Sequence, residues 1–312
     1  MEVGMADDRR GLHLNISLSR ACFVQCKGCY NHFGRMGKTV SSDAVVDFLA
    51  HCRARGFSKV TLCGGDPLAR ADIIPLLRNI KALGMTINLD TVGTPLLGPV
   101  PTRFFDRVEV DRVEAADLAR LVDVIGIPVD GSSEDSVASF RSGRDSFLEE
   151  QLIILKTLDS ADAKLCINTV VHKENIEDIP NILPLLEPFE AIIKWQLFQF
   201  SPTGPLGFRN RSRYLIADAV FDAVASEMRK NAIGSRLQDR LEFKSNANRK
   251  SSYLLIDSAG LAWIPRMSPG SDWDSEKDAN DLRIIIGDIS KNDDYQSIID
   301  TALDPRRIVG LS

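Results

Sequence analysis

The sequence lacks three features that characterise large classes of proteins. It has no excess of positive charge, because 38 Lys and Arg are outnumbered by 43 Asp and Glu to give a net charge of −5. It contains no run of the ~18 apolar residues that a membrane span requires, and residues 1–10 hold no apolar core of a signal peptide. These absences argue against nucleic acid or a membrane as a partner, and they predict a cytoplasmic protein.

Cysteine is also scarce, with six residues in 312 and none after Cys166. In a reducing compartment so few cysteines do not form a disulfide framework, so each is a core residue, a redox thiol or a metal ligand. Cys52 falls on an amphipathic helical stretch, and Cys63 and Cys166 fall on strand-like stretches. We expect these three to be packing residues, which leaves the other three to decide the chemistry.

Strand-like and helix-like periods alternate from about residue 12 to about residue 230. Six segments are predicted to be strands, at residues 12–18, 59–63, 86–90, 122–129, 164–171 and 192–200. Helical stretches separate these segments along the chain. Six strand and helix units in sequence predict a parallel α/β architecture.

Polar residues alternate with apolar residues on several of these strands. Asn88 and Asp90 share one face of the third strand, Asn168 lies on the polar face of the fifth, and Lys194 and Gln196 share one face of the sixth. A doubly wound sheet buries both faces, so its strands are nearly continuously apolar. The alternation therefore predicts a partial (β/α)6 barrel whose lumen binds something polar, with an antiparallel sheet that has one wet face as the alternative.

The pattern changes after the sixth strand. Residues 201–207 form a turn-rich break, and we place the barrel core at residues 1–205. Residues 206–312 are predicted to be a short α+β extension that covers the barrel opening. Within it we expect a helix at about 218–230, a hairpin that turns at 258–260 and a strand at 283–289.

Three cysteines follow directly on the first strand: Cys22, Cys26 and Cys29. Three thiolates within eight positions can converge on one metal centre, and Arg20 and Lys27 add positive charge that favours the thiolate form. The spacing favours an iron–sulfur cluster with one iron left without a cysteine. A structural zinc-binding module, with a tetrahedral site completed by His32, is the alternative.

The cysteine motif resembles that of the radical S-adenosylmethionine (radical SAM) superfamily, C-x3-C-x2-C after the first barrel strand. A second stretch, Gly64-Gly65-Asp66-Pro67, is similar to the Gly-Gly-Glu-Pro turn with which that family holds the methionyl ammonium. The resemblance covers residues 12 to about 200. It implies that the cysteines bind one four-iron–four-sulfur (4Fe–4S) cluster and that the turn binds S-adenosylmethionine. It also implies cleavage to a 5′-deoxyadenosyl radical, with an electron donor such as flavodoxin or ferredoxin.

The sequence departs from the family pattern at two positions. Asp66 is one methylene shorter than the usual Glu, which questions whether its carboxylate or only the backbone contacts the ammonium. Gly28 stands where an aromatic residue commonly precedes the third cysteine and packs near adenine. Tyr30 is our candidate to replace that aromatic side chain.

Further polar residues are predicted to contact cofactor or substrate. Asp90 lies at a strand end where such enzymes often bind ribose or substrate. Asp130 is similar to the family's aspartate after the fourth strand and is expected to meet substrate or methionyl groups, with a helix cap as its alternative role. Asn168 and Gln196 are candidate polar contacts, and Lys194 is a candidate partner for an anion.

The absence of cysteine after Cys166 argues against auxiliary clusters and favours a small-molecule substrate. Overall size, the single cluster motif and the truncated tail resemble the radical decarboxylases of nucleoside-antibiotic pathways that act on cytosylglucuronic acid. Short segments at 194–199 and 252–257 are similar to viperin, a nucleotide-modifying radical enzyme. The sequence therefore predicts decarboxylation of a nucleoside or sugar acid, with a radical SAM peptide maturase or a viperin-like enzyme as alternatives.

The resemblance to decarboxylases implies two catalytic groups. One cation must bind the substrate carboxylate, and Lys194 or an arginine of the 209–213 segment is the candidate. One base must lie near the sugar hydroxyl, and Asp90, Asp130 and His13 are the candidates.

Overall fold

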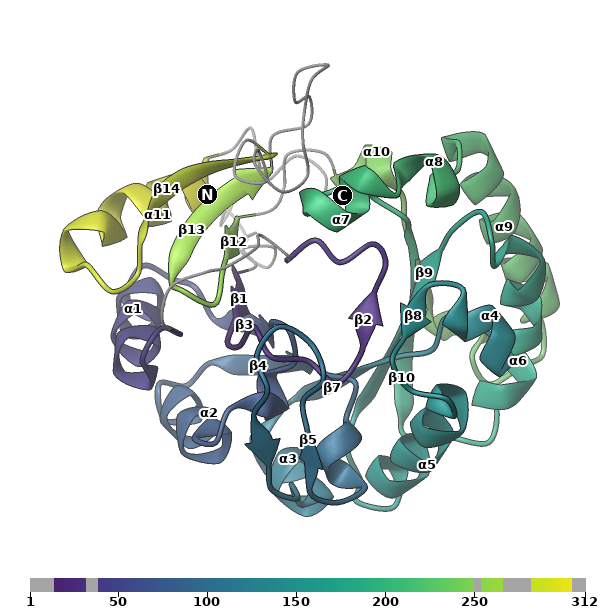
Figure 1. Ribbon diagram of the computed structural model, residues 1–312, viewed down its shortest axis with the longest axis horizontal. Helices are drawn as coiled ribbons and strands as arrows, with labels where there is room; N and C mark the ends of the chain where they lie inside the picture. Colours follow the sequence, from purple (N-terminus) through teal and green to yellow (C-terminus); the bar gives the residue numbers. More distant parts are fainter. Residues whose placement is uncertain (1–13, 32–38, 250–253, 266–281, 305–312) are drawn as a thin grey trace, which may run out of the picture.

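The computed structural model describes residues 14–31, 39–249, 254–265 and 282–304, and a ten-stranded sheet curved into an open barrel dominates it (Figure 1). Six parallel strands follow one another round the barrel in sequence order. They are β1 (Leu14–Ser17), β3 (Lys59–Cys63), β4 (Thr86–Asp90), β7 (Val124–Pro128), β9 (Leu165–Val171) and β10 (Ile192–Gln199). The predicted partial (β/α)6 barrel is confirmed, and the antiparallel alternative is wrong.

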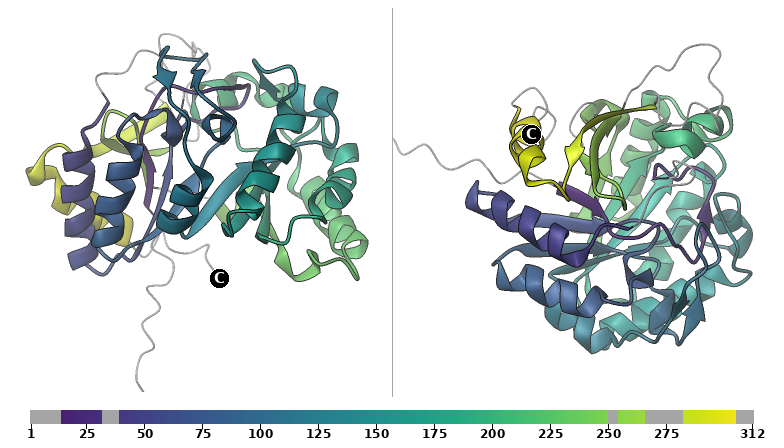
Figure 2. Two further views of the ribbon diagram at one scale, coloured as in Figure 1. Left: turned by 90° about the horizontal axis from the view of Figure 1, so that it is seen from below. Right: turned by 60° about the vertical axis from the view of Figure 1, so that its left-hand side comes forward.

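Helices surround the outside of the sheet and pack their apolar stripes against it (Figure 2). The main helices are α1 (Ser42–Ala54), α2 (Ile73–Ala82), α3 (Ala115–Leu121), α5 (Phe147–Asp159), α6 (Ile179–Leu186) and α9 (Asp218–Asn231). In α2 the buried residues Ile73, Leu76, Leu77 and Ile80 recur at helical spacing and form one face. In α1 the Ser41 side chain accepts a hydrogen bond from the Ala44 amide and so caps the start of the helix.

The apolar residues of the strands point outward to these helices. Leu62 and Leu89 are fully buried, whereas Asn88 and Asp90 on the other face of β4 are half-buried. The alternation fails at one position on β10, where a β-bulge between Ile192 and Lys194 leaves Ile193 42% exposed.

Residues after 205 extend both edges of the same sheet. On one edge β11 (Leu241–Lys244), which the sequence did not predict, pairs in parallel with β10. On the other edge β12 (Leu255–Ile256) pairs in parallel with β1 and continues into antiparallel β13 (Leu261–Pro265) and β14 (Arg283–Asp288). The predicted hairpin and last strand are therefore confirmed, and the boundary between residues 205 and 206 stays a prediction.

Shorter elements complete the described part of the chain. Two small ladders pair β2 (Gln25–Cys26) with β8 (Arg141–Ser142) and β5 (Val100–Pro101) with β6 (Glu109–Val110). The remaining helices are α4 (Glu134–Ala138), α7 (Gly204–Arg209), α8 (Arg211–Tyr214), α10 (Asn246–Arg249) and α11 (Tyr295–Leu303). Single 3-10 turns lie at η2 (Pro67–Ala69), η3 (Thr94–Leu96), η4 (Ile176–Asp178), η5 (Gln238–Arg240) and η7 (Asn292–Asp294). None of the described helices has the length and apolar character needed to cross a bilayer.

The loop after β1 and the turn after β3 are joined through their backbones. The Gly65 amide donates to the Ser19 carbonyl at 2.6 Å, and the Asp66 amide donates to the Ala21 carbonyl at 2.8 Å. A Cβ atom on Gly65 would lie 2.1 Å from the Arg20 carbonyl oxygen. Position 65 therefore tolerates no side chain, because backbone atoms fill the space where one would begin.

Replacing Gly65 with alanine is expected to lower the free energy of unfolding by about 3 kcal/mol, since the added methyl group meets loop backbone that is hydrogen-bonded to the turn itself. Gly84→Ala is the matched control, because Gly84 has a φ of +73° but a Cβ atom there would lie 4.0 Å from its nearest neighbour, Arg53 Nε. The control is expected to cost only about 1 kcal/mol, the penalty of the left-handed backbone. Urea unfolding measures both, and equal losses would contradict the close contact at Gly65.

Candidate active site

The candidate residues gather where the parallel strands end. The Gly64–Pro67 turn follows β3, Asp90 ends β4, and Asp130 follows β7. The carboxyl ends of parallel strands meet at one side of a barrel, which is where such folds place their active sites. The cysteine loop follows β1 and reaches the same side.

The three cysteines of the loop are held at separate anchor points. Cys22 forms an isolated antiparallel bridge with Phe104, and Cys26 lies opposite Arg141 in the β2–β8 ladder. The Cys29 amide donates to the Cys26 carbonyl at 3.2 Å. All three are free thiols, and the Cys22 thiol donates to the Gly65 carbonyl at 3.2 Å.

This donor set fits an iron–sulfur cluster, because such clusters are held by cysteine thiolates and three free thiols lie on one loop. Burial raises the pKa of each of the three thiols, and that of Cys29 to about 12, so ligation must release their protons. Among the described residues no group of three His, Cys, Asp or Glu side chains is placed to hold a single metal ion. His32, the predicted fourth zinc ligand, lies outside the described residues.

The buried Asp66 carboxylate binds other groups of the protein. Asp66 is 1% exposed, and its carboxylate accepts hydrogen bonds from the Leu68 amide at 2.9 Å, the Thr91 hydroxyl at 2.7 Å and the Val92 amide at 2.8 Å. Burial raises the pKa of this carboxyl to about 6, although the same hydrogen bonds act to lower it. Asp66 thus ties the turn after β3 to the segment after β4.

Asp90 and Asn168 meet inside the barrel. The Asn168 amide donates to Asp90 Oδ1 at 3.0 Å across the intervening strand β7. A Cβ atom on Gly126 would lie 2.0 Å from Asp90 Oδ1, so the pair exists because position 126 has no side chain. Burial raises the pKa of Asp90 to about 6, which brings its titration close to neutral pH.

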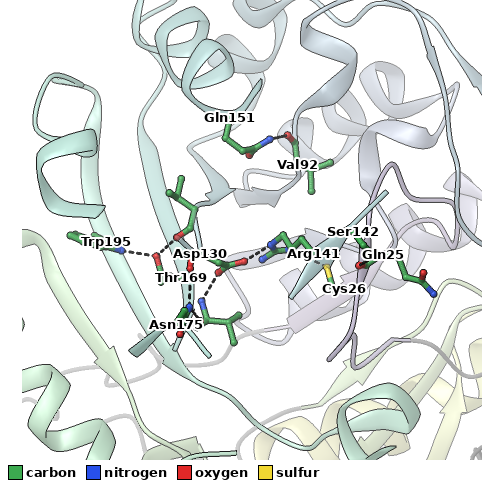
Figure 3. A network of polar contacts seen from close by, with 12 residues as sticks. Gln25, Cys26, Val92, Asp130, Arg141, Ser142, Gln151, Thr169, Asn175 and Trp195 are labelled. Atoms are coloured by element: carbon green, nitrogen blue, oxygen red, sulfur yellow. Dashed lines mark hydrogen bonds and ion pairs between the residues drawn. The ribbon is translucent and has the colours of Figure 1, made fainter. Parts of the chain in front are cut away.

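Asp130 belongs to a buried network that ends on a cysteine (Figure 3). Its carboxylate pairs with the Arg141 guanidinium and accepts a hydrogen bond from the Val170 amide at 2.7 Å. Arg141 Nη1 in turn donates to Cys26 Sγ at 3.0 Å. Burial alone lowers the pKa of Arg141, but the Asp130 and Cys26 charges outweigh it and raise that pKa, so the guanidinium stays charged.

The network corrects two expectations from the sequence. Asp130 does not cap a helix, because Ser133 is the cap of α4. Arg20 and Lys27 are not the cations beside the cysteines. Arg20 Nε lies 3.7 Å from an Asp106 carboxylate oxygen, and Lys27 donates to the Ser139 carbonyl at 2.9 Å. Arg141 takes that place instead, and no feature of the sequence around it indicated the contact.

The space beside Gly28 is filled by aromatic rings from other parts of the chain. A Cβ atom on Gly28 would lie 2.5 Å from the Phe200 ring and 2.8 Å from the Phe140 ring. Position 28 is therefore a glycine because the Phe140 and Phe200 rings fill the space that a side chain there would need. The Tyr30 hydroxyl lies 3.2 Å from Cys63 Sγ and its ring packs beside Leu255 and Trp263, so its expected place near adenine stays a prediction.

A group of charged side chains faces the barrel interior nearer the start of the strands. The Glu242 carboxylate on β11 lies 2.8 Å from Lys194 Nζ and 3.0 Å from Lys244 Nζ, and it accepts from Gln196 at 2.9 Å. Burial acts to raise the pKa of Glu242, but these hydrogen bonds lower it to about 2. Burial, followed by the nearby Lys194 charge, lowers the pKa of Lys59 at the start of β3.

The sequence placed Lys194 and Gln196 on this face but missed their partner, Glu242. The charged residues Glu242 and Lys244 alternate with apolar residues, which is a pattern typical of a strand. The pattern is only four residues long, so it is a weak indication of β11. Among the other proposed cations, Arg213 pairs with Glu174 on the exposed surface, and Arg209 and Arg211 are also exposed. His13, a proposed base, lies outside the described residues.

Two sequence relatives match part of the chain. The AdoMet-dependent heme synthase of Methanosarcina barkeri is 28% identical over 181 residues, which are 58% of this chain and 47% of that protein. The PqqA peptide cyclase of Bradyrhizobium diazoefficiens is 26% identical over 178 residues, 56% of this chain and 43% of that protein. This chain therefore spans about half the length of these relatives. They do not support the expected likeness to cytosylglucuronic acid decarboxylases or viperin.

Solved structures of Streptococcus suis SuiB have the same fold. SuiB bound to S-adenosylmethionine matches with a TM-score of 0.64 at 15% identity, covering 96% of this chain and 67% of SuiB. SuiB bound to the precursor peptide SuiA matches with a TM-score of 0.66 at 14% identity, covering 96% of this chain and 66% of SuiB. Finally, the sequence model of the radical SAM superfamily matches residues 16–186. That match spans more than half of the chain and includes the cysteine loop and the glycine turn, so this protein belongs to the radical SAM superfamily.

Proposed function

We propose that this chain binds one 4Fe–4S cluster through Cys22, Cys26 and Cys29, binds S-adenosylmethionine beside the Gly64–Pro67 turn, and acts on a substrate in the barrel lumen. The observation that carries the proposal is the backbone junction that joins the loop of three free thiols to that turn, with Cys22 Sγ 3.2 Å from the Gly65 carbonyl. When bound, cluster and cofactor supply a 5′-deoxyadenosyl radical on reduction by a donor such as flavodoxin or ferredoxin.

The glycine turn binds the methionyl ammonium through its backbone. The Asp66 carboxylate already accepts hydrogen bonds from Leu68, Thr91 and Val92, which leaves backbone carbonyls as the acceptors. The Gly65 carbonyl accepts from the Cys22 thiol in this structure. Because ligation removes the thiol proton, it also frees this carbonyl to accept from an ammonium.

Asp90 is a better candidate than Asp130 for the base that holds or moves a proton. Its pKa of about 6 lets it be ionised at neutral pH, and only one of its oxygens accepts from Asn168. Asp130 has one oxygen paired with Arg141 and the other bonded to the Val170 amide, so it acts by holding Arg141. Gln196 likewise acts through Glu242, to which it donates.

We infer that the substrate is a peptide. The support is a sequence relative that is a peptide cyclase and a shared fold with SuiB, whose structure was solved with a precursor peptide. A core at residues 1–205 would hold the radical chemistry. Residues 206–312 would form the extension over the barrel opening, with no auxiliary cluster, since no cysteine follows Cys166. In Figure 1, α7 and α10 lie near the open side of the barrel, which supports a covering role for this part of the chain.

Decarboxylation of a nucleoside or sugar acid is the second candidate, and the charged lumen favours it. Lys194 and Lys244 both pair with one carboxylate, Glu242, whose pKa of about 2 keeps it ionised, and Lys59 lies near enough for the charges of Lys194 and Glu242 to act on its pKa. An excess of cations in the lumen can bind a substrate carboxylate even though the whole chain is acidic.

Replacing Cys22, Cys26 or Cys29 with alanine is expected to abolish cluster binding, because each change removes one thiolate ligand. Iron content and broad visible absorbance measure the cluster after anaerobic reconstitution, and 5′-deoxyadenosine formation measures the chemistry. Cys52→Ala is the control, since Cys52 is a fully buried thiol on α1 away from the loop. A cluster that survives in any of the three loop variants would reject the ligand assignment.

The two substrate candidates are separated by anaerobic incubation with dithionite and S-adenosylmethionine. One arm contains a peptide encoded beside this protein, and the other contains cytosylglucuronic acid. We expect the peptide to change mass and to increase 5′-deoxyadenosine formation, with no change in the Cys26→Ala protein. Loss of carbon dioxide from cytosylglucuronic acid beside an unchanged peptide would instead establish the second candidate.

A further inference from the structure

Arg141 contacts a predicted cluster ligand through both its backbone and its side chain. It lies directly opposite Cys26 in the β2–β8 ladder, and its Nη1 donates to Cys26 Sγ at 3.0 Å. Its side chain is 11% exposed, so water does not screen this contact strongly. Cys22 and Cys29 have no comparable charged donor among their described contacts, where Cys22 meets the Gly65 carbonyl.

The guanidinium lies between the Asp130 carboxylate and the Cys26 sulfur. Its Nε pairs with the Asp130 carboxylate, which is fully buried, while its other end meets the sulfur. A buried cation needs a partner of this kind, since an unpaired one is costly in a region of low dielectric constant. Asp130 is held in turn by the Val170 amide and so fixes where the guanidinium lies.

We propose that Arg141 is a positioning residue that orients Cys26 Sγ and raises the reduction potential of the cluster, and that Asp130 moderates this effect. The inference rests on the proposed function, because it requires Cys26 to ligate the cluster. Hydrogen bonds to the ligand sulfurs and nearby charge are among the factors that set cluster potentials. A cationic donor favours the reduced state, which carries one more negative charge, and the Asp130 carboxylate opposes it.

Two substitutions separate this role from a structural one. Arg141→Met and Asp130→Asn both break the same buried ion pair, so a purely structural role predicts the same direction of change for both. The electrostatic role predicts opposite directions, since the first change removes the cation and the second removes the anion that moderates it.

The experiment is an anaerobic redox titration of the reconstituted proteins, followed by the EPR signal of the reduced cluster. At a fixed potential we expect the ratio of oxidised to reduced cluster to rise about tenfold in Arg141→Met, equivalent to about 59 mV for one electron. The ratio is expected to fall in Asp130→Asn, and Arg141→Lys is expected to restore part of the wild-type value. Arg144→Met is the matched control, because Arg144 is also largely buried but pairs with Glu150.

Opposite shifts in the two variants, with Arg144→Met unchanged, support the proposal. Shifts in the same direction, or no shift at full iron content, overturn it. If Arg141→Met does not bind four irons, the proposal is tested by Asp130→Asn alone. A ratio of oxidised to reduced cluster in Asp130→Asn that equals or exceeds the wild-type ratio then overturns the proposal. A wild-type protein that binds no cluster would instead reject the proposed function, and the inference with it.

Discussion

The candidate site depends on the close backbone contact between the loop after β1 and the turn after β3. Gly65 donates to the Ser19 carbonyl, and the Arg20 carbonyl occupies the space that a side chain at position 65 would need. This contact brings a loop of three cysteines and a glycine turn together without any side chain between them. It therefore sets where a metal cluster and a ligand can lie relative to the barrel, since β1 and β3 are neighbouring strands of the sheet.

Buried charges fix the rest of the site around that contact. Asp66 joins the turn after β3 to the segment after β4, and Asp130 holds Arg141 against Cys26. Both carboxylates were expected to contact cofactor or substrate. In the structure they bind groups of the protein instead. Asp90 with Asn168, and the lysines around Glu242, are among the described side chains that face the lumen. The proposed function thus assigns substrate chemistry to residues on the strands and cofactor binding to the loops.

The barrel was predictable from the sequence because its strands have one apolar and one polar face, and helical periods separate them. Asp90 and Asn168 were identified for the same reason, although their contact depends on the missing side chain of Gly126. Three features escaped prediction. The alternation of apolar and charged residues in β11 is only four residues long, and a bulge on β10 leaves Ile193 exposed. The contact between Arg141 and Cys26 joins residues 115 positions apart, which no local pattern reveals.

If Cys22, Cys26 and Cys29 bind the cluster as proposed, one of its irons has no cysteine ligand and is open to S-adenosylmethionine. The EPR spectrum of the anaerobically reconstituted, dithionite-reduced protein, recorded before and after addition of S-adenosylmethionine, measures both properties. We expect the signal of one reduced four-iron cluster per chain and a change in that signal when S-adenosylmethionine is added, because it would bind at the iron without a cysteine. A protein that carries zinc and gives no signal, or a cluster signal that S-adenosylmethionine leaves unchanged, would show that the proposed ligation is wrong.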